Sequence, residues 1–529
     1  MRLFVRSIAV TVASMFCVCA CYDLDLDESQ YHTRKYQFSN FDKVKEVMTN
    51  VYGYLESGFY NFQECASDDA VYANSPDVLK QYYDGSWSAN KVVDDKWGHY
   101  YAGIRAANYL LENCPDDYDI SRWDEQYPVY LEQLRNYPWE ARALRAYYHA
   151  ELLKRYRNII IADRTFTEKE VNTLVPVSYD KALEWISSEL AECVENLPET
   201  YSGTYYSEIG RVTKGFAQAA NIRLLLYAAS PLNNPDGNTS CWAKAAAKAK
   251  AMIDENAKSL RFSLVAQSFN VEGKDLVFGI REAASSTFER NNFPVGYENG
   301  NSGMCPSLNL VESFDDGDPR LAKAVLSNGD NFKGETVESF HGGRNGLPKD
   351  NASPTSFYLK KFVQEATSLT AGNLTSYQHI YPLFRYSEVY LNYAEALFEA
   401  TDNPDFTGSL EGVSYTMSPR AAVNAVRKVY SLEDLPSGLS SEMFRTKLHN
   451  ERRVELCFEG HRFWDIRRWK TGDVTEKIYG LDIRRRADGS FVTERRLVQT
   501  RYWNDRMYWY PVSEKERHKN PNLIQNPGW

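Results

Sequence analysis

Apolar side chains recur at three- and four-residue steps in several long segments of the chain, a spacing that puts them on one face of an α-helix. The clearest case is DKALEWISSELAECVENLP, in which Leu183, Ile186, Leu190 and Leu197 form the apolar stripe and Pro198 ends it. Similar patterns predict helices over 97–114, 137–158, 211–230, 384–399 and 418–430, and a pair over 444–459 and 461–470. The pattern predicts a mainly α fold of stacked helix pairs, although no exact 34-residue repeat is present.

Two long intervals lack this periodicity and are rich in Gly, Asn, Ser and Asp. Segments such as DLVFGIRE (275–282) and SYQHIYPLFR (376–385) allow short strands here. Long loops of this kind usually carry function. We therefore expect a single unit over 41–529, with a helical core at about 41–261 and 381–470 and loop-rich parts at about 262–380 and 471–529.

The first twenty residues have the pattern of a secretory signal peptide. Arg2 and Arg6 precede a mostly apolar run that is too short to span a bilayer. This run ends at Ala20-Cys21, which resembles the lipobox of bacterial lipoproteins, where the cysteine is acylated after cleavage. We expect a signal peptide over 1–20 and lipidation, for example with palmitate, at Cys21.

An acidic run, YDLDLDE, follows Cys21 directly. A calcium-binding loop would begin with similar alternating aspartates, but it would need a glycine where Glu28 stands. Residues 21–40 are therefore interpreted as an acidic, solvated tether. The run also resembles the export signal that directs Bacteroidetes lipoproteins to the outer face of the outer membrane.

Composition and charge narrow the classes of function. The formal net charge of −10 argues against nucleic-acid binding, which favours clustered Lys and Arg. The sequence contains 37 Tyr and 11 Trp, an unusually large supply of amphipathic rings, which favours an aromatic binding surface. Cysteines and histidines are scattered without CxxC or HExxH spacing, and nucleotide-binding glycine motifs are absent from the sequence. We therefore expect neither a metal nor a cofactor.

The densest group of charges lies in ERRVELCFEGHRFWDIRRWK, residues 451–470, with five arginines and four acids around Gly460. Pairing among Arg452, Arg453, Arg462 and Asp465 would form a directional network that fixes the junction between helices and loops. A glycoside hydrolase would instead use two of the four acids, Glu451, Glu455, Glu459 and Asp465, as acid and nucleophile. Because each acid has a basic residue nearby, the structural interpretation is favoured.

This stretch matches the signature E-R-R-x-E-L-x-x-E-G-x-R-x-x-D-L-x-R-W, which is typical of the SusD/RagB family of surface lipoproteins, with Ile466 in place of Leu. Five further blocks resemble the family in the same order: ARALRAYYHAELLKRY, GRVTKGFAQAANIRLLLYAAS, FDDGDPR, FRYSEVYLNYAEA and YWYPVSEKERHKNPNLIQNPGW. The resemblance implies tetratricopeptide-like helix pairs packed against a loop-rich part with few short strands. It also implies a lipid-anchored, surface-facing protein of the outer membrane that covers a SusC-like TonB-dependent barrel as a substrate-binding lid.

Sugar binding needs flat apolar rings together with planar hydrogen-bonding groups, and two loops offer both. In 77–101, Tyr83 and Trp87 accompany Asp84 and Asn90; in 286–303, Phe293 and Tyr297 are interleaved with polar residues. We expect these six residues to bind the ligand. The other aromatic residues considered are expected to pack in the core: Trp97, Tyr101, Trp503, Tyr508, Trp509 and Tyr510.

The function expected from these features is capture of oligosaccharides by a non-enzymatic, cell-surface lipoprotein that passes them to a SusC-like transporter. Three alternatives stay open: a peptide-binding RagB-like lipoprotein, a secreted glycoside hydrolase, and a scaffold whose helix pairs hold other proteins. Binding of oligopeptides but of no glycan would favour the peptide-binding alternative over the expected function, and release of product would identify a hydrolase.

Overall fold

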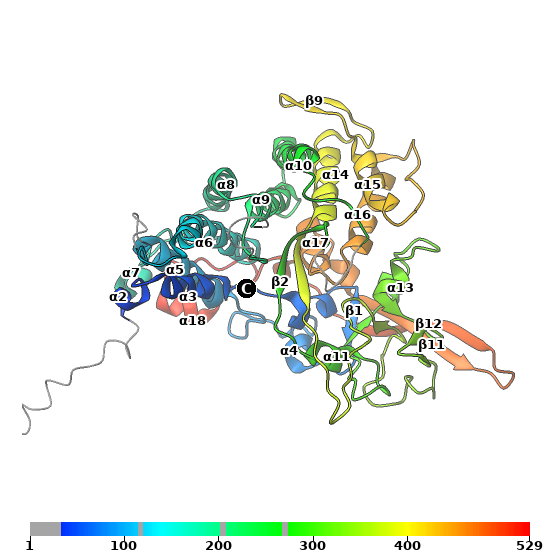
Figure 1. Ribbon diagram of the computed structural model, residues 1–529. Helices are drawn as coiled ribbons and strands as arrows, with labels where there is room; N and C mark the ends of the chain where they lie inside the picture. The colour runs from blue at the N-terminus through cyan, green and yellow to red at the C-terminus, as the bar shows by residue number, and fades with distance from the viewer. Residues whose placement is uncertain (1–32, 115–119, 202–207, 267–272) are drawn as a thin grey trace, which may run out of the picture.

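The computed structural model describes residues 33–114, 120–201, 208–266 and 273–529. The expected signal peptide 1–20, the lipidation site Cys21 and most of the tether 21–40 lie outside the described residues. Helices dominate the described part, and the strands are mostly short (Figure 1). The predicted mainly α fold is confirmed.

The long helices form a row in which each contacts the next one. In order, the row contains α5 (Trp97–Asn113), α6 (Tyr127–Tyr156), α8 (Tyr179–Asn196), α9 (Lys214–Ala229), α10 (Thr239–Ser259) and α14 (Tyr386–Thr401). Helix α3 (Phe41–Tyr52) packs on α5 and α6, and α14 contacts both α15 (Pro419–Lys428) and α16 (Ser441–Glu455). The contact between α10 and α14 joins segments that the whole loop-rich part separates in sequence (Figure 1).

Local sequence signals set the ends of several helices. Helix α15 begins after Ser418, whose side chain accepts a hydrogen bond from Ala421 N, and Pro419 occupies its first turn. Helix α6 departs from the prediction of 137–158, because it begins at Tyr127 and continues through Pro138. A proline in a helix removes one hydrogen bond, and α6 continues through this position while it packs against both α5 and α8.

The two predicted strands are present and pair with each other. Strand β2 (Leu276–Arg281) and strand β8 (Ile380–Arg385) run antiparallel. The other short pairs are β1 (Ala70–Tyr72) with β3 (Met304–Pro306), β4 (Val325–Leu326) with β7 (Tyr358–Leu359), β5 (Asn331–Phe332) with β6 (Glu335–Thr336), and β9 (Gly408–Leu410) with β10 (Val413–Tyr415).

A long hairpin, β11 (Lys477–Arg485) with β12 (Phe491–Thr500), projects from the body (Figure 1). The Gly-, Asn-, Ser- and Asp-rich composition of 471–529 predicts only loop-rich chain here. The overlooked signal is the Asp488-Gly489 pair between two alternating segments, because Gly489 adopts a positive φ of 86° in the connecting turn.

Short helices complete the described structure: α2 (Arg34–Gln37), η2 (Gly58–Tyr60), η3 (Glu64–Ala66), α4 (Asp77–Lys80), α7 (Glu168–Val171), α11 (Thr287–Asn292), α12 (Leu308–Val311), α13 (Leu321–Ala324), α17 (Arg462–Trp469), η4 (Gly472–Thr475), η5 (Asp505–Tyr508) and α18 (Glu514–Lys519).

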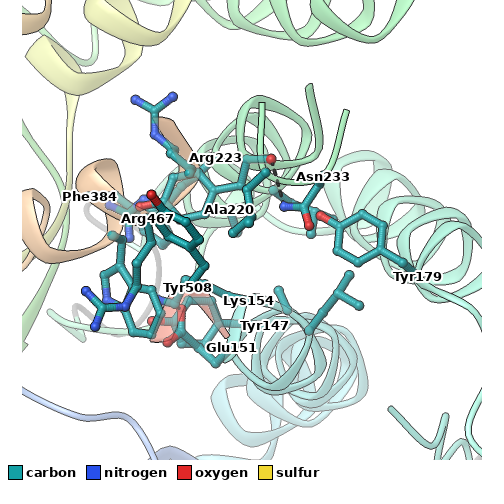
Figure 2. Close-up of a pocket in the computed structure, with 17 residues that line it drawn as sticks. Tyr147, Glu151, Lys154, Tyr179, Ala220, Arg223, Asn233, Phe384, Arg467 and Tyr508 are labelled. Carbon is teal, nitrogen blue, oxygen red and sulfur yellow. Dashed lines mark hydrogen bonds and ion pairs between the residues drawn. The ribbon is translucent and has the colours of Figure 1, made fainter. Parts of the chain in front are cut away.

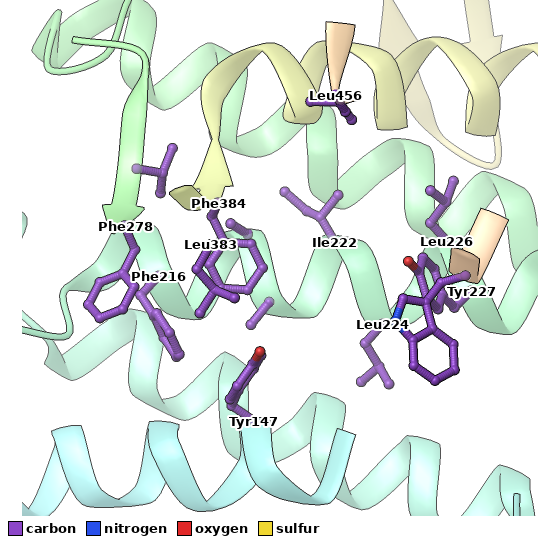
Figure 3. Close-up of a cluster of buried hydrophobic side chains, with 14 of the residues drawn as sticks. Tyr147, Phe216, Ile222, Leu224, Leu226, Tyr227, Phe278, Leu383, Phe384 and Leu456 are labelled. Carbon is purple, nitrogen blue, oxygen red and sulfur yellow. The ribbon is translucent and has the colours of Figure 1, made fainter. Parts of the chain in front are cut away.

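The main core is centred on α9 (Figure 3). Phe216 of α9 contacts Phe278 of β2 and Phe384 of β8, with ring centroids 4.8 and 5.3 Å apart. The strand pair is thereby packed against the helical row.

Candidate functional site

The signature stretch 451–470 forms the predicted pair of helices around a glycine turn. Helix α16 ends at Glu455, four residues earlier than predicted, and α17 begins at Arg462. Gly460 lies between them with φ +78°, a backbone conformation that favours glycine.

Every acid of this stretch is buried and paired with a cation. Glu455 accepts hydrogen bonds from Arg320 and Arg385. The further pairs are Glu451–Arg320 at 2.6 Å, Glu451–Arg427 at 2.8 Å, Glu459–Lys361 at 2.7 Å, Asp465–Arg452 at 2.8 Å and Asp465–Arg468 at 2.7 Å. These contacts define the signature network. They leave no acid of the stretch free to act as a general acid or nucleophile.

The network also fastens a segment from the other end of the chain. Arg453 and Arg462 lie 3.0 and 2.7 Å from carboxylate oxygens of Asp68. Burial alone would raise the pKa of Asp68, but these two arginines outweigh it and lower that pKa to about 2. The predicted pairing within the stretch is therefore present for Arg452 with Asp465, whereas Arg453 and Arg462 pair with an acid outside the stretch.

Glu64 is the exception in this region. Its Oε1 accepts a hydrogen bond from Gly460 N at 2.6 Å, and its Oε2 has no partner among the described residues. Burial, reinforced by the nearby Asp69 carboxylate, raises the pKa of Glu64 to about 8.

The predicted aromatic residues of the 77–101 loop face the core. Trp87 is 1% exposed, and its ring lies 4.9 Å from that of Tyr510 and 5.0 Å from that of Trp529. Tyr83 is also buried, beneath the guanidinium of Arg501 at 4.6 Å. A ring enclosed in this way offers no face to a sugar, so the expectation that they stack on a ligand does not fit this structure. Asp84 and Asn90 are exposed.

Phe293 and Tyr297, predicted in the second loop, are buried in a separate small core. Both rings pack edge-on against Phe332, at 5.2 and 5.1 Å, and Arg344 covers Tyr297. The two predicted groups therefore belong to different hydrophobic clusters, and neither presents a ring to solvent. The packing expected for Trp97, Tyr508 and Tyr510 is found, since all three are buried, and Tyr101, Trp503 and Trp509 are half-buried.

A cleft of about 360 Å³ lies beside the 77–101 loop. We name it the Phe62 cleft. Its apolar wall contains the half-buried ring of Phe62, with Tyr82 and Val93. Its polar wall contains Glu56, Asn61, Gln63, Asp94, Lys96 and Glu282.

The polar groups of the Phe62 cleft hold one another in place. Asp94, in a left-handed conformation that aspartate tolerates, accepts from Gln63 Nε2 at 3.1 Å and lies 3.1 Å from Lys96 Nζ. Lys96 also pairs with Glu56. Burial lowers the pKa of Lys96, but the two carboxylates outweigh it and raise that pKa above its usual value.

Some hydrogen-bonding capacity in this cleft is unused. The Glu282 carboxylate has no ion pair or hydrogen bond to any described side chain or backbone group. The side-chain amide of Asn61 donates to no group within the described residues. A partly exposed ring beside planar amides and carboxylates is the combination that sugar hydroxyls and C–H faces require.

Phe62, Gln63 and Asp94 are not among the site residues predicted from the sequence. A signal was available in GFYNFQEC, residues 58–65, where rings alternate with amides and helical periodicity is absent. The 77–101 loop was the correct region in one respect, because Tyr82, Val93 and Asp94 from it line the cleft.

Within the described ranges, no helix combines the length and apolar character that crossing a bilayer requires. Nor do the described His, Cys, Asp and Glu side chains gather in a group of three or more that could hold a metal ion. The six described cysteines are free thiols, and Cys65, Cys193, Cys305 and Cys457 are buried, as small apolar residues would be.

The chain is similar to known proteins over most of its length. The SusD-like protein P2 of Formosa agariphila is 24% identical over 466 residues, which cover 83% of this chain and 81% of that protein. Two crystal structures from Bacteroides fragilis NCTC 9343 share the fold. The first is a SusD-like protein with a TM-score of 0.74 at 23% identity, and the match covers 93% of this chain and 98% of that protein. The second is a SusD-like carbohydrate binding protein with a TM-score of 0.73 at 22% identity, and the match covers 92% of this chain and 100% of that protein.

The profile of the SusD family matches residues 266–529, which include the whole signature network stretch. The family match, the curated relative and the shared fold agree with the signature that resembles the family in the sequence. The chain therefore belongs to the SusD/RagB family.

Proposed function

We propose that this protein is a cell-surface lipoprotein that captures oligosaccharides in the Phe62 cleft for uptake through a SusC-like TonB-dependent barrel. The observation that carries the proposal is the cleft itself, which Phe62 lines together with Asp94 and with Glu282, whose carboxylate has no partner among the described residues. Its volume of about 360 Å³ suits a few sugar rings at most. A structural relative named as a carbohydrate binding protein supports the same class of ligand.

The cleft favours binding over hydrolysis. A glycosidase needs two carboxyl groups on opposite sides of the scissile bond. Glu56 and Asp94 both accept from the Lys96 ammonium, which leaves Glu282 as the one lining carboxylate without a partner among the described residues. We therefore propose that the protein holds glycans without cleaving them.

Isothermal titration against a panel of oligosaccharides and a mixture of oligopeptides tests this proposal. Phe62→Ala should weaken glycan binding about tenfold, because the ring supplies one stacking face. The matched control is Phe491→Ala, which removes an exposed ring from the β11–β12 hairpin and should leave affinity unchanged. Binding of peptides without any glycan, or release of sugar products, would reject the proposal.

The lipid anchor is a separate part of the proposal and rests on the sequence around Cys21 together with family membership. Cys21→Ala should move the protein from the membrane fraction to the soluble fraction of the cell. Unchanged retention at the membrane would show that another feature anchors it.

A further inference from the structure

A second, smaller cavity lies between α6, α9 and α17, apart from the Phe62 cleft, and no residue lines both. Figure 2 shows its lining around an open centre, with Glu151 and Lys154 of α6 below, Tyr179 and Asn233 on one side and Arg467 on the other. Its volume is about 40 Å³. One water needs about 10–15 Å³ of such space, so the cavity has room for a small ion but not for a sugar ring.

Arg467 is a buried cation without a carboxylate. It is 3% exposed, and none of the described acids lies within ion-pair distance of it. Its Nη1 donates to Phe463 O at 3.0 Å, and its guanidinium lies 3.4 Å from the centroid of the Phe463 ring. Its Nε–H has no acceptor in the described part of the chain. The adjacent Arg468, by contrast, pairs with both Asp465 and Glu395.

Lys154 is only half compensated. It lies 2.7 Å from Glu151, and the same carboxylate also pairs with Arg155 at 2.6 Å. Burial lowers the pKa of Lys154 to about 8 and that of Arg467 to about 10. Both shifts have the sign expected of cations that lack enough negative charge nearby.

The cations that line the cavity are unequally paired. Arg223 and Arg468 have carboxylate partners of their own. Lys154 shares Glu151 with Arg155, and Arg467 has no acid within ion-pair distance among the described residues. A buried cation that lacks a counter-charge is costly unless an anion accompanies it.

We infer that the cavity is a binding site for a small monovalent inorganic anion, held by Arg467 and Lys154 and enclosed by the rings of Trp464 and Tyr508. An anion there would neutralise part of the charge that joins α17 to α6, and so stabilise the junction between these helices.

Thermal unfolding in sodium chloride and in sodium gluconate, at equal ionic strength, tests the inference. Wild-type protein should melt about 1–3 °C higher in chloride, with a dependence that saturates, since an anion that binds only the folded state stabilises it. Arg467→Met and Lys154→Met should each lose this difference. The control Arg484→Met removes an arginine that is 72% exposed and paired with Asp482, and should keep it.

Crystals soaked in bromide give an answer that does not depend on whether the variants fold. The expected result is an anomalous peak within contact distance of the Arg467 guanidinium and the Lys154 ammonium. The inference is overturned if the cavity holds no bromide, or if the chloride-specific difference in melting temperature persists unchanged in both variants.

Discussion

The signature network and the Phe62 cleft both contain many charged side chains, but they differ in how completely those side chains are paired. In the network, Glu451, Glu455 and Asp465 are each buried against two guanidinium groups. In the cleft, Glu282 has no partner among the described residues and Phe62 keeps part of its ring accessible. A dense group of charges therefore marks the frame of this molecule, whereas a few incompletely paired groups mark its candidate site.

The largest effect should come from breaking the network. Glu455→Gln removes the buried carboxylate that Arg320 and Arg385 both contact. Loss of one partner from such a group typically costs about 3–5 kcal/mol. The free energy of unfolding, from denaturant titration followed by circular dichroism, should fall by this order. A loss below about 1 kcal/mol would show that the network does not hold the fold together.

Trp87 sharpens the comparison, because its loop position suggests a ligand contact and its burial indicates packing. Trp87→Ala should lower the free energy of unfolding by about 3 kcal/mol or more, as expected for removal of a fully buried ring. Differential scanning calorimetry measures the change, and Phe62→Ala serves as the half-exposed comparison. Weakened glycan binding at unchanged melting temperature would instead place Trp87 in the binding site.

A smaller, pH-dependent effect should come from Glu64. Its pKa of about 8 in the folded protein lies above the ordinary value of 4.5, so the folded state holds this proton more tightly than the unfolded chain does. The wild-type free energy of unfolding should therefore decline as the pH rises from about 5 to 8, by about 2 kcal/mol or more.

Glu64→Gln removes the titrating group while keeping an oxygen that can accept from Gly460 N. Denaturant titrations at pH 5, 6, 7 and 8 should show a flatter profile for this variant, with its largest gain over wild type at pH 8. Parallel profiles for the two proteins would mean that Glu64 is ionised in the folded state at neutral pH.

Much of the fold was predictable because helices are encoded locally. The apolar stripe ending at Pro198 and the Ser418-Pro419 cap each set a helix through neighbouring residues alone. The pairing of β2 with β8 was not predictable, since it joins segments near the two ends of the loop-rich part at about 262–380. The β11–β12 hairpin had a local signal in Asp488-Gly489 that was overlooked.

The candidate site was predictable in region but not in residue. Sequence pattern placed rings in the 77–101 loop, but which side of a loop faces solvent depends on distant partners such as Tyr510 and Trp529, which cover Trp87. For the same reason, the pairs that Arg453 and Arg462 form with Asp68, near the opposite end of the chain, could not be predicted from the signature stretch alone. Contacts of this kind have no local periodicity that would reveal them.

Hydrogen exchange measured with and without a saturating glycan tests the central contrast most directly. Bound glycan should slow amide exchange in 56–63 and 93–96, the segments that line the Phe62 cleft, and should leave 451–470 and 286–303 unchanged. Phe62→Ala at the same glycan concentration should reduce this protection. Protection confined to 451–470 or to 286–303, with none at the cleft, would contradict the assignment of binding to the cleft and of structure to the network.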